Sequence, residues 1–159
     1  PREVLDEANA VGSEVRPQEL EGREDCRRHQ VITIDPDDAK DFDDAICLER
    51  ADAGHWRLWV HIADVSHYVK PGTALDDEAR RRGNSTYLVD RVIPMLPEAL
   101  SNELCSLKPH VDRLTKCVEF LVTNDGRVVG AKFYPAVIHS QRRFTYREAF
   151  EILQRQPSG

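Results

Sequence analysis

Two long alternating runs surround Asn124-Asp125-Gly126, in the stretch "LTKCVEFLVTNDGRVVGAKFYPAVI" at residues 114–138. Apolar and polar side chains alternate along both runs, and a period of two is typical of a strand with one buried face. Asn, Asp and Gly favour the positive φ angles that a tight hairpin turn needs. The stretch therefore predicts a β-hairpin of two long strands.

Other segments predict further strands and two helices. Residues 55–65, "HWRLWVHIADV", have strand character and follow a turn at residues 52–55, so we expect a second hairpin with residues 44–50. Thr73, early acids, late arginines and Gly83 indicate a helix at residues 73–83. Residues 30–34 predict a further strand, residues 145–153 a second helix, and residues 1–30 a leader segment. Together these segments predict an α+β fold with a mixed, mainly antiparallel sheet and flanking helices.

Composition limits the class of protein. The 159 residues are 40% hydrophobic and 31% charged, which suits one soluble domain with its own core. No apolar run approaches the length of a membrane span, so we expect no membrane partner and a cytoplasmic location. The net charge of −6 argues against a surface that attracts nucleic acid non-specifically, but it allows a local acidic site that holds metal ions.

Four cysteines are spread along the chain without a C-x-x-C pair. We interpret them as reduced structural thiols and expect no zinc site. They are Cys26, Cys47, Cys105 and Cys117.

The most unusual segment is "VITIDPDDAKDFDDAICLER", residues 31–50, in which six aspartates lie between Asp35 and Asp44 beside a single Lys40. A solvated loop is the ordinary explanation of such a run. Here apolar runs bracket the aspartates, and repulsion between them would reduce stability unless cations such as Mg²⁺ or Mn²⁺ offset it. An EF-hand loop would need Gly and Glu where Lys40 and Ile46 stand, and a haloacid dehalogenase motif fits poorly.

The spacing I-D-x5-D-x-D-D, together with "HIADVS", "PMLP" and "LSNELCSL" in order, resembles the ribonuclease II and ribonuclease R family, and ribonuclease R more closely. The resemblance implies that residues 31–159 are the N-terminal half of an RNB catalytic domain. It implies hydrolysis of single-stranded RNA from its 3′ end to nucleoside 5′-monophosphates, with Mg²⁺, or Mn²⁺ as an alternative, in a two-ion site. The catalytic and metal-binding residues would be Asp35, Asp41, Asp43 and Asp44.

The same resemblance assigns two substrate-binding tyrosines. Tyr87 would pack against the 3′-terminal base, and the alternative is a half-buried strand tyrosine. Tyr146 would contact the sugar, and the alternative is a core aromatic at the start of a helix. By contrast, the spacing of His61, Asp64 and His67 does not suit a metal triad on a strand, so we expect structural roles for them.

Two other classes of function stay open: a non-catalytic RNA-binding relic of this family, and an unrelated Mg²⁺-binding phosphotransfer domain. The relic would predict a broken set of aspartates, whereas the set is intact. The phosphotransfer domain would leave "HIADVS" and "PMLP" unexplained. In the family, a later Arg, a later Glu and a second aromatic assist catalysis. We therefore expect the isolated chain to be inactive or nearly so, and to self-associate through exposed strand edges and apolar surface.

Overall fold

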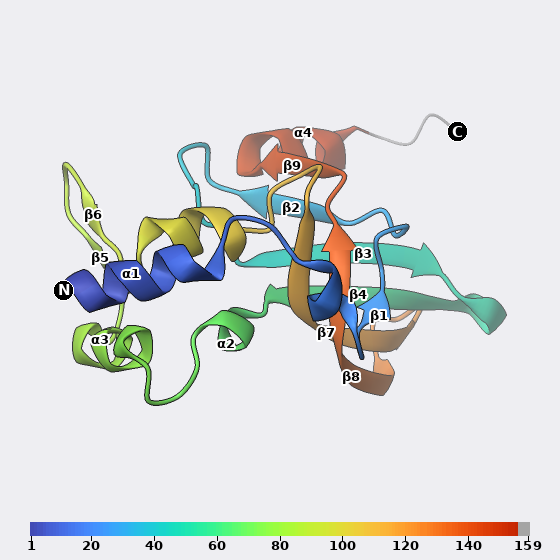
Figure 1. Ribbon diagram of the computed structural model, residues 1–159. Coiled ribbons are helices and arrows are strands. Elements are labelled where there is room, and N and C mark those ends of the chain that lie inside the picture. The colour runs from blue at the N-terminus through green and yellow to red at the C-terminus, as the bar shows by residue number, and fades with distance from the viewer. Residues whose placement is uncertain (156–159) are drawn as a thin grey trace.

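The computed structural model describes residues 1–155, in which seven strands form one mixed sheet (Figure 1). The strand order is β1-β8-β7-β4-β3-β2-β9. β1 pairs with β8 and β2 with β9 in parallel, and every other pair in this sheet is antiparallel. This confirms the predicted α+β fold. The strands are β1 (Glu24–Asp25), β2 (Ile32–Asp35), β3 (Asp44–Arg50), β4 (His55–Ala63), β7 (Asp112–Thr123), β8 (Val128–His139) and β9 (Arg142–Thr145).

Strands β7 and β8 form the long hairpin that the sequence predicts. Gly126 lies in their turn with φ 84°, a conformation that other residues rarely adopt. The Gly126 N–H donates to the Thr123 carbonyl oxygen at 2.9 Å, and the register shifts once, between Leu121 and Val122. The predicted hairpin of β3 and β4 is also present, with a short 3-10 turn at Asp52–Gly54 between them.

Several elements differ from the sequence prediction. The run at residues 55–65 ends as a strand at Ala63, and the chain then turns into helix α2 (Val65–Tyr68). Strands β5 (Thr86–Tyr87), β6 (Val92–Ile93) and β9 and a π-helix at Ala99–Leu104 were not predicted. Elements of two to six residues carry too few side chains to show a period, so tertiary contacts decide them.

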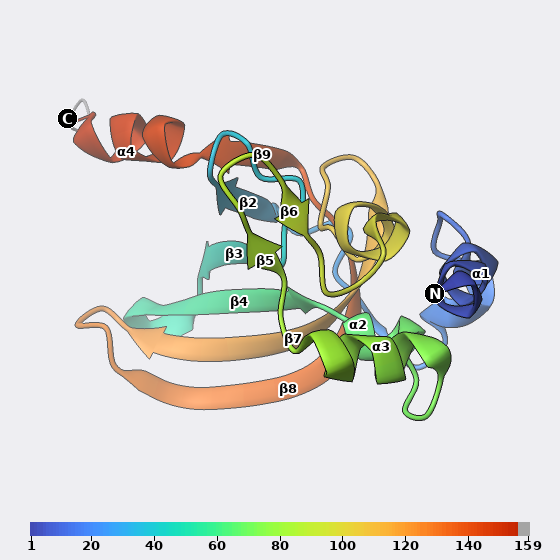
Figure 2. The same ribbon diagram turned by 90° about the vertical axis from the view of Figure 1, so that its left-hand side faces the viewer.

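The predicted helices are present, and the first of them has the expected caps. Helix α3 (Ala74–Arg82) begins after Thr73, whose hydroxyl accepts the Asp76 N–H at 3.3 Å, and it ends at Gly83 with φ 77°. Helix α4 (Tyr146–Gln154) begins with a capping box between Thr145 and Glu148. α1 (Arg2–Val11) and α3 lie together beyond one end of the sheet, and α4 follows β9 (Figures 1 and 2). In the part of the chain that the structure describes, no helix is long and apolar enough to cross a membrane.

The two faces of the sheet differ in burial. One face carries the core, which includes Trp59, Cys117 and Ala136. The other face leaves Leu48, Ile62 and Phe133 exposed. This apolar face is consistent with the expected self-association of the isolated chain, which stays a prediction.

The segment before residue 31 is tied to the sheet at several points. A short 3-10 helix at Pro17–Leu20 carries the buried Glu19, and β1 adds to the edge of the sheet beside β8. Arg23 then forms a buried ion pair with Asp64, with 2.7 Å between Nη2 and Oδ2. The division of the chain at residue 30 stays a prediction.

Candidate metal centre

The four motif aspartates lie on and between two adjacent strands. Asp35 is the last residue of β2 and Asp44 the first of β3, and these strands run antiparallel. Asp41 and Asp43 lie on the loop that joins them. The loop is therefore anchored at both ends, unlike the solvated run that composition alone would suggest.

A buried serine from a distant part of the chain also holds this loop. The Ser106 hydroxyl accepts the Phe42 N–H at 3.0 Å and donates to the Lys40 carbonyl oxygen at 2.8 Å. The Leu107 N–H donates to the Phe42 carbonyl oxygen, and the Ala63 N–H donates to the Asp43 carbonyl oxygen. The segments "LSNELCSL" and "HIADVS" thus shape the backbone from which Asp41 and Asp43 extend.

The electrostatics of the cluster favour a cation. Asp35 is only 8% exposed, and one of its carboxylate oxygens is buried without a hydrogen-bond partner. Burial raises the pKa of Asp35, and the charges of Asp44 and Asp41 raise it further. Partial desolvation raises the pKa of Asp43 too, followed by the charges of Asp41 and Asp44. A divalent ion would offset this repulsion and satisfy the unpaired oxygen of Asp35.

The donor set suits a hard ion. Four carboxylates offer only oxygen ligands, which Mg²⁺ and Mn²⁺ prefer. A second group of potential metal ligands among the described residues consists of Cys26, His29 and His61. The ligand atoms of these three side chains all lie within 4.8 Å of one another.

A cleft of about 670 Å³ opens beside the aspartates. Tyr87, on β5, lines this cleft and is 68% exposed, with its hydroxyl 3.4 Å from Asp41 Oδ2. The charge of Asp41 raises the pKa of Tyr87. Figure 2 shows the β5–β6 hairpin beside the loop that follows β2. Of the aspartates, the cleft is lined by Asp35, Asp38, Asp41 and Asp43, so Asp38 faces this space although the sequence analysis did not select it.

Tyr146 lies at the same end of the sheet but does not line the cleft. Its neighbour Thr145 pairs with Asp35 across β9 and β2, and Tyr146 then begins α4 with 62% of its surface exposed. It is thus not a core aromatic, and Tyr87 is not half-buried. The structure brings Tyr87 and the aspartates together, whereas Tyr146 stands beside them on the neighbouring strand end.

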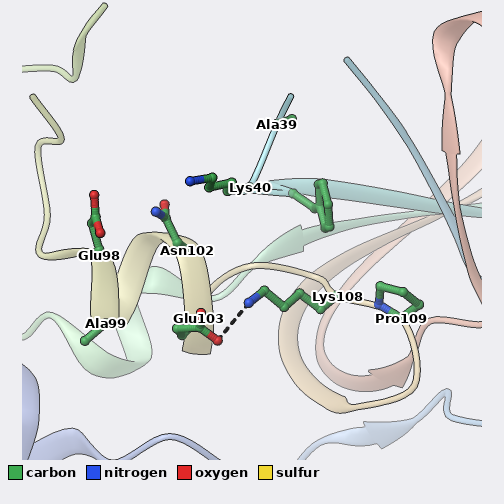
Figure 3. Close-up of a pocket in the computed structure, with 9 residues that line it drawn as sticks. Ala39, Lys40, Glu98, Ala99, Asn102, Glu103, Lys108 and Pro109 are labelled. Atoms are coloured by element: carbon green, nitrogen blue, oxygen red, sulfur yellow. Dashed lines mark hydrogen bonds and ion pairs between the residues drawn. The ribbon is translucent and has the colours of Figure 1, made fainter. Parts of the chain in front are cut away.

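A second hollow, also about 670 Å³, lies on the other side of Lys40. Lys40, Glu98 and Asn102 line both this hollow and the cleft. Figure 3 shows these side chains in the upper part of the view and the ion pair between Lys108 and Glu103 (2.7 Å) below them. The π-helix therefore supplies polar groups to the border of the acidic site.

Arg143 is a neighbour of the cluster that the sequence analysis missed. It lies on β9 and donates from Nη2 to the Pro36 carbonyl oxygen. Its positive charge offsets part of the rise in the pKa of Asp35. Its Nε is buried without a hydrogen-bond partner. The stretch "QRRFT" precedes Tyr146 directly, and the parallel pairing of β9 with β2 is what brings it to the aspartates.

The polar residues of "HIADVSH" make structural contacts. His61 is fully buried, with Nδ1 3.1 Å from the Thr115 hydroxyl. Asp64 pairs with Arg23, while His67 Nε2 lies 2.9 Å from Glu19 Oε1. Arg23 Nη2 lies 2.7 Å from Asp64 Oδ2 and 3.2 Å from His67 Nδ1, so these two side chains share an arginine while His61 stands apart. These contacts agree with the structural roles that the sequence predicts.

Comparison with known proteins now identifies the family. Residues 23–159 match the RNB domain. The chain belongs to the RNB domain family. It is 54% identical to ribonuclease R of Thermotoga maritima and 51% identical to that of Escherichia coli K12, each over 97% of the chain but only 22% and 19% of the relative. The solved structure of Mycoplasma genitalium RNase R in complex with ribose methylated single-stranded RNA matches it with a TM-score of 0.89 at 36% identity, over 99% of this chain and 25% of that one.

These matches confirm the resemblance to ribonuclease R and the RNB fold. The chain spans about a fifth of the length of the curated relatives it matches. The aspartates and tyrosines discussed above all fall inside the matched residues 23–159. Their individual roles in this RNB domain stay predictions.

We expect Ser106→Ala to impair the acidic site without touching a carboxylate. The variant leaves the buried Phe42 N–H without an acceptor, which costs about 1–3 kcal/mol of stability. It also releases the Lys40 carbonyl, so Asp41 and Asp43 lose their positions and metal affinity falls. The matched control is Ser140→Ala, a serine equally buried whose hydroxyl contacts only Val31. Denaturant unfolding and Mn²⁺ titration measure the two effects, and equal Mn²⁺ affinity in both variants would refute the positioning role.

Proposed function

We propose that this RNB domain supplies the acidic site of an exoribonuclease, which removes nucleotides one at a time from the 3′ end of single-stranded RNA and releases nucleoside 5′-monophosphates. The observation that carries the proposal is that three anchored motif aspartates, Asp35, Asp41 and Asp43, line a cleft that also exposes Tyr87. The fourth, Asp44, begins β3 directly after Asp43. The likeness to ribonucleases R, one of them solved with single-stranded RNA, supports RNA as the substrate.

We propose Mg²⁺ as the physiological cofactor, with Mn²⁺ as a substitute, held by Asp35, Asp41, Asp43 and Asp44. Bound in pairs, such ions make a nucleophile from water at neutral pH and stabilise charge on the leaving oxygen. The protein's own contribution is to fix the carboxylates on a rigid loop, which Ser106 holds from behind. The buried setting of Asp35 strengthens its interaction with cations, and a cation would relieve the repulsion that Asp41 and Asp44 exert on Asp43.

Two tyrosines would handle the RNA. Tyr87 offers an exposed ring beside Asp41, where it can stack on the terminal base without preference for its identity. Tyr146, exposed on the end of the strand beside Asp35, is placed to contact a ribose close to the same site. Lys40, Arg91 and Arg143 bring positive charge to the border of the cleft, which would attract the phosphate backbone.

We further propose that residues 31–159 form the N-terminal half of the RNB catalytic domain and that residues 1–30 lead into it. The match of residues 23–159 to the RNB domain supports placing residues 31–159 in that domain. The four free, buried cysteines fit a reducing compartment, so the cytoplasm is the proposed location.

A labelled homopolymer tests the proposed activity. The full-length enzyme is expected to shorten 5′-labelled single-stranded RNA stepwise with Mg²⁺ and to release only nucleoside 5′-monophosphates. Chelation should stop the reaction, and added Mg²⁺ or Mn²⁺ should restore it, because the carboxylates alone supply no activated water. Internal cleavage, or activity that survives chelation, would refute the proposal. Tight RNA binding without any cleavage would favour the non-catalytic relic.

Tyr87→Ala is expected to lengthen the residual oligonucleotide that the enzyme leaves undegraded. Stacking of one base contributes about 1–3 kcal/mol, and its loss matters most when few nucleotides remain to hold the RNA. Tyr87→Phe is the matched control, because it keeps the ring and removes only the hydroxyl that faces Asp41. High-resolution gels of the end products measure the effect. If Tyr87→Ala and the wild type leave the same final product, Tyr87 does not stack on the terminal base.

A further inference from the structure

One thiol and two imidazole rings come together on the buried face of the sheet, and they form a cluster separate from the four motif aspartates. The ligand atoms of Cys26, His29 and His61 all lie within 4.8 Å of one another. Cys26 and His61 are completely buried, and His29 is partly covered. A second buried thiol, Cys117, has its Sγ 4.0 Å from His61 Nε2. The chain thus gathers two sulfur and two imidazole groups in a nearly water-free place.

Backbone pairing explains why these residues meet. His61 on β4 lies directly opposite Cys117 on β7, so their side chains share the buried face of the sheet. Cys26 follows β1, and its N–H donates to the Val137 carbonyl oxygen at 2.9 Å. The His29 N–H donates to the Cys26 carbonyl oxygen at 3.1 Å, which closes a turn that sets both residues over the sheet. The turn has the spacing Cys-x2-His, a ligand spacing that the sequence analysis overlooked.

The hydrogen bonds around the two rings leave nitrogen atoms available as ligands. Thr115 contacts His61 Nδ1 at 3.1 Å, so the other ring nitrogen, Nε2, faces Cys117. Burial lowers the pKa of His61 to about 4, so the ring is neutral and keeps a lone pair at neutral pH. His29 packs against Trp59 with 4.6 Å between the ring centroids and 52° between the ring planes, yet its Nδ1 is buried without a hydrogen-bond partner. A buried polar atom without a partner reduces stability unless a ligand satisfies it.

We propose that Cys26, His29, His61 and Cys117 form a structural site for a zinc-class divalent ion. Two cysteines and two histidines are a common tetrahedral donor set for Zn²⁺. With Zn–S near 2.3 Å and Zn–N near 2.0–2.1 Å, tetrahedral ligand atoms stand roughly 3.3–3.8 Å apart. The ligand atoms of Cys26, His29 and His61 lie within 4.8 Å of one another, so they would approach by up to about 1.5 Å, and Cys117 Sγ would join from its place 4.0 Å from His61 Nε2.

Charge and proton balance suit a buried site. Each cysteine gives up one thiol proton when its sulfur binds, so one Zn²⁺ releases two protons and the resulting cluster is neutral. A neutral cluster avoids the penalty of an unpaired buried charge. Burial raises the pKa of Cys26 to about 12 and that of Cys117 to about 11, so both are protonated thiols before the ion binds. The bound ion would fasten the segment around β1 to β4 and β7.

Cobalt absorption tests the site directly. We expect the reduced protein to bind one equivalent of Co²⁺ with a thiolate-to-metal charge-transfer band, which Zn²⁺ then abolishes. Zn²⁺ should release two protons per ion and raise the thermal midpoint. His29→Ala should weaken binding by more than the roughly 10–100-fold that loss of an outer-shell partner causes. Its side chain is partly exposed, so this variant should still fold.

Two controls separate this site from other effects. Cys105→Ser removes a buried thiol outside the cluster and should leave the band unchanged. Asp43→Asn should also leave it unchanged, because carboxylates give no thiolate band. Cys117→Ser should shift and weaken the band. Absence of the band in the wild type, or full Co²⁺ affinity in His29→Ala, would overturn the proposal and leave the four residues as ordinary core packing.

Discussion

Asp43→Asn is expected to lower RNA hydrolysis by the full-length enzyme by at least about 10²–10³-fold, the loss that follows removal of one charge-stabilising group. Single-stranded RNA binding should change little, because it depends on stacking and backbone charge rather than on chemistry. Turnover and RNA affinity are measured on the same preparation. Asp37→Asn is the matched control, since Asp37 is exposed in the same loop and does not line the cleft. Unchanged turnover in Asp43→Asn would refute the metal assignment.

In the presence of chelator, Asp43→Asn is expected to make the folded protein more stable than the wild type. Partial desolvation and the neighbouring aspartates raise the pKa of Asp43 in the folded state. The folded protein therefore holds this proton more tightly than the unfolded chain does, and it loses stability as the pH rises through that pKa. The uncharged amide removes this loss, so Asp43→Asn should melt at a higher temperature than the wild type at neutral pH. Saturating Mn²⁺ should reverse the order, because only the wild type retains the full ligand set.

Asp64→Ala is expected to destabilise the protein by about 3–5 kcal/mol, since it leaves Arg23 charged and buried without its partner. Asp64 is 2% exposed and also accepts a hydrogen bond from Ser66 at 2.8 Å. Lys116 lies 3.4 Å from the same carboxylate. Denaturant unfolding at neutral pH measures the loss. Glu103→Ala removes an equally short but exposed ion pair with Lys108 and should cost less than about 1 kcal/mol.

The pH dependence of this ion pair follows from its pKa. Burial alone would raise the pKa of Asp64, but hydrogen bonds from Arg23 and Ser66 lower it below its ordinary value. The stabilisation is therefore complete above the pKa of an unfolded aspartate, and it is lost as the pH falls through the folded value. The difference in stability between wild type and Asp64→Ala should shrink in acid. A difference independent of pH would show that lost packing, rather than the ion pair, explains the effect.

The sequence by itself determined the features that rest on neighbouring residues. The alternating runs around Gly126, the cap at Thr73 and the helix at residues 145–153 depend on contacts within a few residues, and the structure contains all of them. The spacing of the aspartates was readable for the same reason, because Asp35 and Asp44 lie within one strand-loop-strand unit. The RNB resemblance was carried by these local motifs and is confirmed.

Only the tertiary structure decided what stands beside those motifs. Ser106 holds the acidic loop from 64 residues away, and Tyr87 reaches Asp41 across 46 residues. The short strand β9 brings Arg143 to the aspartates, and the pairing of β4 with β7 sets His61 against Cys117. Such contacts depend on how the strands pack into one sheet, and neither the period nor the propensity of a single segment contains that information.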